Sequence, residues 1–498
     1  MDLDDDQCYR ALLAHDARFD GRFFVGVGTT RIYCRPVCTA RTPHRHNCRF
    51  FPSAAAAESE GFRPCLRCRP ELAPGYAIVD ANRRLAQAAA GLIEDGRLED
   101  ASLADLASTL GVTDRHLRRV FQQEFGVSPV EYAQTQRLLL AKRLLTDTGL
   151  PVLEIAMASG FASLRRFNDL FRTRYRMTPG ELRRASPARR PPGRLDFDLA
   201  YRPPYDWEAM LAFLGRRAIA GVEAVDGKRY RRTLGLGARL RGGDGTRGGD
   251  AAKGGDQRLV GWVEVAPSPR KSALRVTMSA SLAGAAPAVL ARMKCLLDLA
   301  GRPDEIAGAL GALAADHPGL RLPGAADGFE VAVRAILGQQ VTVKAAATLA
   351  ARFSKAFGVP IATPHAELDR LFPRASEVAA LDPARIAGLG VIASRARAIV
   401  ALAAEVASGR LRLEPNADIA PTIAKLERLP GVGPWTAQYI AMRALAWPDA
   451  FPHPDVAVLK AMREKDARRA LERAEAWRPW RAYAVLHLWK SLESPKEP

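Results

Sequence analysis

The strongest constraint on the fold of this 498-residue chain lies in residues 429–455, LPGVGPWTAQYIAMRALAWPDAFPHPD. Gly431 and Gly433 permit a tight connection between two helices and leave the backbone amides bare enough to approach a phosphate closely. Residues 436–445 repeat apolar side chains at helical spacing, and a proline-punctuated loop then presents one carboxylate, Asp455. A Gly-Val-Gly turn is common between packed helices and is a weak signal by itself. The turn, the helix and the carboxylate together form a much more specific pattern.

The charge of the chain predicts a polyanionic partner. The sequence has 73 Lys and Arg residues against 54 Asp and Glu, a formal net charge of +19. Nucleic acid is the simplest partner for such a surface, although an Arg-rich composition without such a role is the alternative. The acidic first residues lack the basic start of a signal peptide, and no apolar run approaches a membrane span. We therefore expect a cytosolic chain without a membrane partner, and the length predicts three or four domains.

Four of the seven cysteines form two closely spaced pairs. Cys34 and Cys38 are followed, after 26 intervening residues, by Cys65 and Cys68. In a reducing compartment this spacing favours four thiolates around one zinc ion over disulfides or free thiols. Cys8 and Cys48 lack such spacing and are expected to be structural or incidental, and Cys295 stands alone. Residues 31–49 contain five arginines and no acid, which predicts a surface suited to phosphates.

The segments that carry these cysteines, FVGVGTTRIYCRPVC and GFRPCLRCRPE, resemble the amino-terminal domain of the Ada family. The resemblance assigns residues 1–78 to a small zinc-binding α+β domain. It implies that Cys34 is both a zinc ligand and the acceptor of a methyl group from a DNA methylphosphotriester, and that the other three cysteines complete the site. A zinc-bound thiolate stays deprotonated yet nucleophilic at neutral pH, so the implied chemistry is sensible.

Residues 79–186 have the pattern of an all-helical domain with two similar helix-turn-helix units. Thr113 is placed to cap the second helix of the first unit, and Ser163 has the same place in the second. A long helix, at about residues 129–145, is expected to join the two units. The tandem arrangement resembles the AraC-type DNA-binding domain that the Ada family also carries. It implies transcriptional activation, with promoter DNA and RNA polymerase as partners.

The base-reading candidates are the early positions of the second helix in each unit. They are Asp114, Arg115, Arg118 and Arg119 in the first unit, and Leu164, Arg165, Arg166 and Asn168 in the second. Each arginine is equally suited to holding a phosphate.

A basic, proline-rich segment at residues 187–194 predicts a linker between two halves of the chain. Residues 195–308 then show the alternation of strands, for example at Leu274, Val276 and Met278, which predicts a small α+β domain. Within it, residues 241–258 repeat Gly-Gly-Asp three times without the apolar positions of a solenoid, so we expect a flexible insertion.

From about residue 309 the composition becomes helical and alanine-rich. The segments LAYRPPYDWEAMLAFLGRRAIAGVEAV, RLPGAADGFEVAVRAILGQQVTVKAAATLAARF and WRPWRAY, together with residues 429–455, resemble the AlkA family of alkylbase DNA glycosylases. The resemblance assigns residues 195–308 to that family's α+β amino-terminal domain and residues 309–498 to its all-α helix-hairpin-helix glycosylase domain. It implies hydrolysis of the N-glycosidic bond of alkylated bases such as 3-methyladenine.

The resemblance also gives the residues of this region their roles. Asp455 is expected to stabilise an oxocarbenium-like sugar and to orient water. Trp435, Tyr439 and Trp489 are expected to stack on the extruded, cationic base, although each has the alternative of being core only. The hairpin residues expected to hold a DNA phosphate, with help from a monovalent cation, are Gly431, Val432, Gly433 and Thr436. Gln340 stands at the position whose side chain enters the DNA stack as a wedge in this family. AlkA has a leucine there.

Three absences narrow the expected reaction. Trp435 stands where lyase-type relatives have a lysine, so no strand cleavage is expected. No cysteine follows Cys295, which excludes the iron–sulfur cluster of some relatives. The Pro-Cys-His-Arg motif of Ada's second methyl-acceptor domain is absent, so repair of O6-methylguanine is not expected.

The leading hypothesis is a bacterial, nucleoid-associated cytoplasmic protein that senses alkylation damage, activates repair genes and excises alkylated bases. The alternative is a methylation-responsive regulator whose AlkA half is a non-catalytic DNA-binding module. We further expect a protease to cut the linker, and the piece that begins at about Leu195 to excise bases unaided.

Overall fold

The computed structural model describes residues 4–74, 84–94, 98, 102–185, 193–237, 258–270, 272–415 and 417–493. The chain divides into two compact units. Unit 1 comprises residues 1–76, 80–202 and 234–291, and unit 2 comprises residues 77–79, 203–233 and 292–498. The predicted linker and the Gly-Gly-Asp insertion lie outside the described residues, apart from their last positions. Within the described ranges, no helix has the length and apolar character needed to span a bilayer.

Unit 1 begins with a small α+β fold, as predicted. Its sheet has the strand order β3-β1-β2-β4, in which β2 runs parallel to β4 and the other pairs are antiparallel. Cys8 and Cys48 are buried in a small apolar core beside this sheet. The elements are α1 (Asp5–Leu13), β1 (Phe24–Val27), β2 (Ile32–Cys34), β3 (Cys48–Phe51), α2 (Ala54–Ser59), β4 (Arg63–Pro64) and the 3₁₀ turn η3 (Pro70–Leu72).

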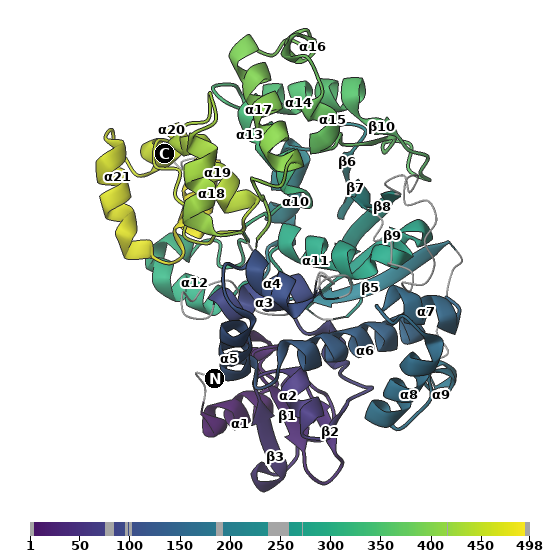
Figure 1. The fold of residues 1–498 in the computed structure, drawn as a ribbon. Helices are drawn as coiled ribbons and strands as arrows, with labels where there is room; N and C mark the ends of the chain where they lie inside the picture. The colour runs from purple at the N-terminus through teal and green to yellow at the C-terminus, as the bar shows by residue number, and fades with distance from the viewer. Residues whose placement is uncertain are drawn as a thin grey trace, which may run out of the picture. The chain divides into compact units, whose positions relative to one another are not determined.

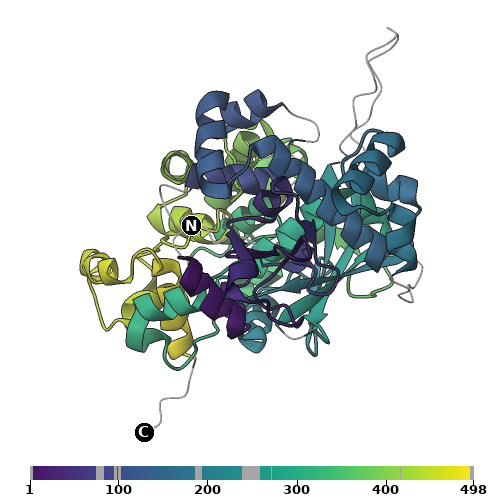
Figure 2. The same cartoon turned by 90° about the horizontal axis from the view of Figure 1, so that it is seen from below.

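The next part of unit 1 contains the two predicted helix-turn-helix units, which lie at opposite ends of the long helix α6 (Figure 1). Figure 2 shows the same two groups of helices from a second direction. The Thr113 hydroxyl accepts from the amide of His116 and the Ser163 hydroxyl from that of Arg166, so both predicted caps are confirmed. The helices are α3 (Arg84–Glu94), α4 (Leu103–Thr109), α5 (Asp114–Phe125), α6 (Pro129–Asp147), α7 (Val152–Ala158), α8 (Leu164–Tyr175) and α9 (Pro179–Arg184).

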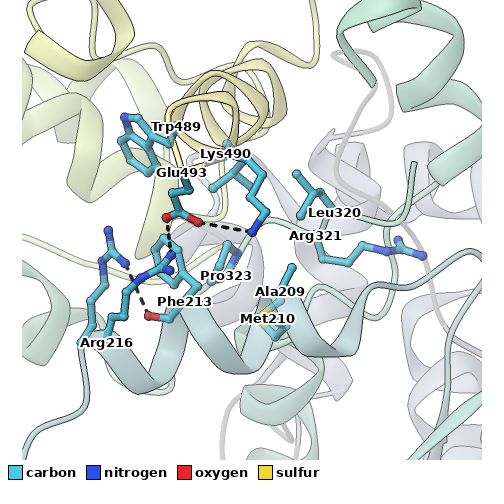
Figure 3. A pocket seen from close by; sticks show the side chains of 12 residues that line it. Ala209, Met210, Phe213, Arg216, Leu320, Arg321, Pro323, Trp489, Lys490 and Glu493 are labelled. Atoms are coloured by element: carbon cyan, nitrogen blue, oxygen red, sulfur yellow. Dashed lines mark hydrogen bonds and ion pairs between the residues drawn. The ribbon is translucent and has the colours of Figure 1, made fainter. Parts of the chain in front are cut away.

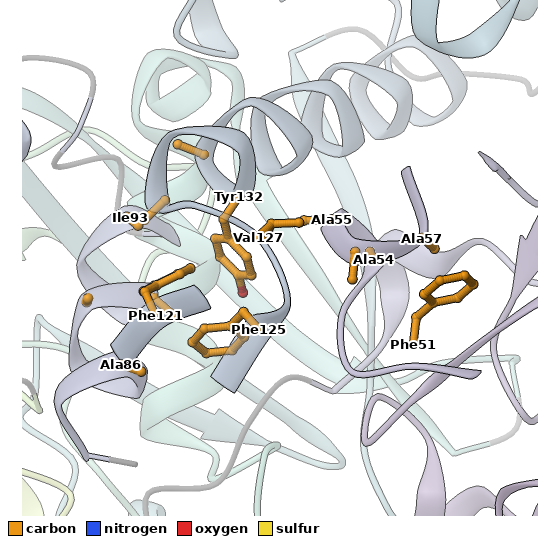
Figure 4. Close-up of a cluster of buried hydrophobic side chains, with 14 of the residues drawn as sticks. Phe51, Ala54, Ala55, Ala57, Ala86, Ile93, Phe121, Phe125, Val127 and Tyr132 are labelled. Carbon is orange, nitrogen blue, oxygen red and sulfur yellow. The ribbon is translucent and has the colours of Figure 1, made fainter. Parts of the chain in front are cut away.

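The small α+β fold at the start of unit 1 and the first helix-turn-helix unit share one hydrophobic core (Figure 4). The Tyr132 ring of α6 lies 5.3 Å from the Phe121 ring and 5.1 Å from the Phe125 ring, measured between centroids. Ala54 and Ala55 of α2 belong to the same buried cluster. Because removing such side chains from water stabilises the folded state, the two parts should fold together.

Helix α2, which contributes to this shared core, also carries a buried carboxyl group, that of Glu58. The Tyr33 hydroxyl donates to one of its oxygens at 3.0 Å and the Thr135 hydroxyl donates to the other, also at 3.0 Å. Burial raises the pKa of Glu58 to about 7, although these hydrogen bonds and the charges of Arg174 and Lys142 act to lower it. Glu58 is therefore protonated in the folded chain at a pH where it is ionised in the unfolded chain.

Glu58→Gln should remove a pH-dependent loss of stability. The wild-type free energy of unfolding should fall as pH rises from about 4.5 through about 7, because only the unfolded state releases this proton there. The glutamine variant lacks this slope and should be more stable than the wild type at pH 8 by up to about 3 kcal/mol. Denaturant melts from pH 5 to 8 measure the difference. Glu60→Gln, at an exposed position, is the control and should keep the wild-type slope.

The predicted α+β domain contains a five-stranded sheet of order β5-β9-β8-β7-β6. The expected strand face is confirmed, since Leu274, Val276 and Met278 of β9 are all buried. Strand β5 is at the edge of the sheet, and α6 lies against it. The Arg143 guanidinium lies 4.7 Å from the centre of the Phe197 ring and donates to the Asp198 carbonyl at 2.7 Å. The strands are β5 (Arg194–Ala200), β6 (Glu223–Asp226), β7 (Arg229–Gly237), β8 (Arg258–Pro267) and β9 (Ala273–Ser279).

Outside that sheet, the described part of unit 2 is helical apart from the short strand pair β10 (Val359–Pro360) and β11 (Arg370–Leu371), which the all-α prediction did not include. Helices α18 and α19 pack together on either side of the glycine hairpin, and α13 packs on α19. The helices from α10 to α15 are α10 (Trp207–Arg216), α11 (Ala286–Leu296), α12 (Pro303–Leu310), α13 (Gly328–Leu337), α14 (Val343–Phe357) and α15 (Ala375–Ala379). Those that follow are α16 (Pro383–Ala387), α17 (Ala393–Ala407), α18 (Ile419–Glu427), α19 (Pro434–Arg443), α20 (Val456–Ala461), α21 (Ala467–Ala474) and α22 (Arg481–Ser491).

Candidate functional site

The two cysteine pairs meet because they follow adjacent parallel strands. Cys34 ends β2, and Cys65 follows β4 directly. The pairing of Tyr33 with Pro64 and the hydrogen bond from the Cys65 amide to the Tyr33 carbonyl, at 3.0 Å, hold these strand ends side by side. The turns that follow bring Cys38 and Cys68 to the same place, as the spacing predicted.

The four thiols have the geometry of a tetrahedral zinc site. All four Sγ atoms lie within 4.8 Å of one another, and four Zn–S bonds of about 2.3 Å would place them about 3.8 Å apart. Hydrogen bonds within the cluster lower the pKa of Cys38 and Cys65 and raise the pKa of Cys34 and Cys68, so the first two thiols are the more easily ionised. Cys38 and Cys65 are buried, whereas Cys34 and Cys68 are only partly so.

One of the five arginines expected to face phosphates does not do so. Arg35 is buried, forms an ion pair with Asp20 and donates to the Cys68 carbonyl at 3.0 Å. Its amide also donates to the Cys68 sulfur at 3.3 Å, so Arg35 helps to position the second cysteine pair. The arginines that remain exposed or half-buried are Arg31, Arg41, Arg45 and Arg49.

The candidate base-reading residues lie on the two predicted recognition helices, α5 and α8. Those exposed are Asp114, Arg115, Arg118, Arg119, Arg165, Arg166 and Asn168, while Leu164 is half-buried. The buried side of α5 carries Leu117 and Phe121, and that of α8 carries Phe167 and Phe171. The helices therefore present these polar residues to solvent, and their individual contacts with DNA stay predictions.

In unit 2, the three aromatic residues of the sequence prediction line one cavity of about 1050 Å³. The Trp435 and Tyr439 rings, one turn apart on α19, stack with centroids 5.3 Å apart and planes 14° apart. Trp489 on α22 lies 6.5 Å from Tyr439. Gln340, Gly431 and Gly433 lie along the same cavity.

Asp455 is held at the wall of this cavity by three N–H donors. The Trp435 indole donates to Oδ2 at 2.8 Å, and the Trp489 indole donates to Oδ1 at 3.1 Å. The Val458 amide also donates to Oδ1 at 2.9 Å, because Asp455 caps helix α20. The two tryptophans thus belong to the carboxylate site as well as to the aromatic wall, which sequence spacing alone did not predict.

Three arginines surround the far end of Tyr439. Arg443 donates to the Tyr439 hydroxyl at 2.8 Å. Burial raises the pKa of Tyr439, but the charges of Arg443, Arg217 and Arg334 outweigh it and lower that pKa overall.

A second cavity of about 50 Å³ lies behind Trp489 (Figure 3). Glu493 forms ion pairs with Arg216 of α10 and with Lys490 of α22. The first of these pairs links the end of α22, which carries Trp489, to α10, and the second lies at the end of α22 itself.

One of the two hairpin glycines has the left-handed conformation that the sequence predicts, whereas Gly433 is extended, with φ of −94°. Gly431 has φ of 81°, in the left-handed region that favours glycine. Thr436 is buried in the first turn of α19, and its hydroxyl accepts from Gln339 at 2.9 Å. A phosphate contact by Thr436 would therefore involve its backbone amide, since its side chain is directed inward. Gln339 had no signal in the sequence beyond its place before Gln340.

Four known domain families match successive segments of the chain. They are the metal binding domain of Ada at residues 7–71, a helix-turn-helix domain at residues 106–185, the AlkA N-terminal domain at residues 196–327, and the HhH-GPD superfamily base excision DNA repair protein at residues 333–480. The order and kinds of domain therefore agree with the predicted architecture, and the resemblance stated from the motifs is confirmed.

Similar proteins span the whole chain or one half of it. The probable bifunctional transcriptional activator/DNA repair enzyme AlkA of Mycobacterium tuberculosis is 39% identical over 99% of this chain and 98% of its own length. DNA-3-methyladenine glycosylase 2 of Escherichia coli is 36% identical over 59% of this chain and 96% of its own. The bifunctional transcriptional activator/DNA repair enzyme AdaA of Bacillus subtilis is 32% identical over 36% of this chain and 83% of its own. The chain thus belongs to the family of the bifunctional transcriptional activator/DNA repair enzyme AlkA.

Proposed function

We propose that this protein hydrolyses the N-glycosidic bond of alkylated bases, 3-methyladenine among them, without cutting the strand. The observation that carries this proposal is the Asp455 carboxylate, which two indole N–H groups hold at the wall of an aromatic cavity. A base inside a duplex must leave the stack to reach such a cavity, and aromatic faces attract a cationic base by about 0.5–2 kcal/mol.

The proposed reaction needs little acid catalysis, because alkylation at a ring nitrogen already makes the base a good leaving group. Asp455 stabilises the positive charge that develops on the sugar and orients the attacking water. Trp435, Tyr439 and Trp489 stack on the base. Gly431, Val432, Gly433 and the Thr436 amide hold the phosphate, with a monovalent cation at the hairpin, and Gln340 fills the place of the extruded base.

In the first half of the chain, we propose that Cys34 accepts a methyl group from a DNA methylphosphotriester. A zinc ion held by Cys34, Cys38, Cys65 and Cys68 would keep their sulfurs as thiolates. The Cys34 sulfur forms a bond to the methyl carbon while the O–CH₃ bond of the phosphotriester breaks, which leaves a thioether and a phosphodiester anion. The exposed and partly exposed arginines nearby hold the DNA backbone.

The methylated protein would then activate transcription of repair genes. The residues proposed to contact promoter DNA are Arg115, Arg118, Arg165, Arg166 and Asn168, and RNA polymerase is the proposed partner at the promoter. A protein with these two DNA-binding activities would associate with the nucleoid of the bacterial cytoplasm. The proposed domain boundaries are those given by the sequence: residues 1–78, 79–186, 195–308 and 309–498, with the linker at 187–194.

A glycosylase assay tests the proposal. The full-length protein, incubated with a duplex that carries one 3-methyladenine, should release the free base and leave an abasic site. The strand should break only after alkali treatment, because Trp435 stands where lyase-type relatives have a lysine. An undamaged duplex is the control. Absence of base release would favour the alternative, a regulator whose AlkA half binds DNA without catalysis.

A further inference from the structure

One glutamine side chain joins the hairpin to a loop on the other side of the cavity mouth. Gln339 lies in the connection between α13 and α14. Its Nε2 group donates to the Gly431 carbonyl at 2.8 Å and to the Thr436 hydroxyl at 2.9 Å. A single amide group therefore uses both of its N–H bonds on the hairpin, one before and one after the turn into α19.

The loop that carries Gln339 holds its neighbour in an unusual backbone conformation. Gln340 has φ of 53°, in the left-handed region that is unfavourable for residues with a Cβ atom. Its side chain is exposed at the cavity. Two residues further on, the Thr342 hydroxyl caps α14 by accepting from the Ala345 amide at 3.2 Å. The loop is thus fixed on both sides of Gln340, by the hairpin and by the helix cap.

We propose that Gln339 is a positioning residue that makes the hairpin and the Gln340 loop act as one rigid surface on DNA. The inference rests on the proposed base excision. The hairpin amides hold a phosphate, and Gln340 enters the stack, so the two must keep a fixed spacing while the base is extruded. Gln339 sets that spacing, because its two hydrogen bonds oppose movement of its loop away from the hairpin.

This role makes a specific demand on the substrate. Extruding a paired base requires breaking its pairing and filling the gap, whereas an unpaired base has lost the pairing already. Loss of the link should therefore slow excision from a paired duplex and have little effect where the alkylated base lies unpaired. A residue that only stabilised the fold would affect both substrates equally.

The test is single-turnover excision by the full-length variant Gln339→Leu, which keeps the side chain's bulk but has no donor. The rate on a paired duplex should fall by about tenfold, as expected for the loss of two hydrogen bonds at a partly exposed site. The rate on a strand with the same base unpaired should fall by less than about twofold. Thr348→Val, which removes an exposed side-chain hydrogen bond to the Lys344 carbonyl on α14, is the matched control and should keep both rates.

A second variant guards against a general loss of folding. Thr436→Val removes one of the two acceptors, and the double variant with Gln339→Leu should be no slower than the slower single variant, because both act on one link. An equal loss on both substrates, additive losses in the double variant, or no loss at all would overturn the inference. If the wild-type protein itself released no base, the proposed function would fail instead, so the two failures can be told apart.

Discussion

Asparagine in place of Asp455 should slow base release by about 10²-fold or more and leave DNA binding in place. An amide carries no negative charge to stabilise the positive sugar of the transition state. It also has one acceptor oxygen, whereas Asp455 accepts from the Trp435 and Trp489 indoles through two different oxygens. One indole would face an N–H group instead, so the aromatic wall should loosen as well.

Single-turnover excision and the affinity for a duplex with an abasic site measure the two effects separately. Asp466→Asn is the matched control, because Asp466 also caps a helix, α21, and accepts from the Arg468 amide at 2.8 Å. It is exposed and does not line the cavity, so its loss should leave base release unchanged. Wild-type release by the Asp455 variant would rule out the carboxylate as the catalytic group.

Methyl transfer to Cys34 should raise the affinity for promoter DNA by about tenfold at low salt. Four thiolates around a zinc ion carry a net charge near −2, and conversion of one to a neutral thioether brings that charge near −1. The attraction between the phosphates and the arginines of this surface, such as Arg31 and Arg41, is then less opposed. The gain should shrink as salt is added, because the affected interactions are screened.

Mass spectrometry after exposure to methylphosphotriester DNA should find one methyl group, on Cys34. Cys34→Ala should accept none and should show no gain in promoter affinity. Cys48→Ala is the control, because Cys48 is a buried thiol of the same domain outside the four-cysteine cluster, and it should accept the methyl group as the wild type does. A methylated protein that binds its promoter no better would leave a plain zinc domain.

Local sequence signals predicted the elements that depend on near neighbours. Thr113 and Ser163 cap their helices because a hydroxyl before a helix reaches the amide three positions on, which spacing alone reveals. The four cysteines were predicted for a similar reason, since only a few ligand patterns satisfy zinc. The glycine hairpin and the single carboxylate after it were likewise visible in one continuous stretch.

Contacts between distant residues were not predictable in this way. Arg35 has the same place in the sequence pattern as its exposed neighbours, and its burial depends on Asp20, which only the folded sheet brings to it. Gln339 meets Gly431 across 92 positions of the chain. The indole hydrogen bonds to Asp455 require two helices to converge on one loop. Such contacts depend on tertiary packing, and no local pattern in the sequence reveals which distant residues will meet.

The cover that α6 gives to strand β5 affects where the chain can be divided. A fragment that begins at Leu195 would start inside β5, without Arg143 on the Phe197 ring and the Asp198 carbonyl. An uncovered edge strand can pair with the same strand of another molecule, which is a route to aggregation. Recombinant production of the glycosylase half would therefore need a charged or proline substitution on that edge, or a start that retains α6.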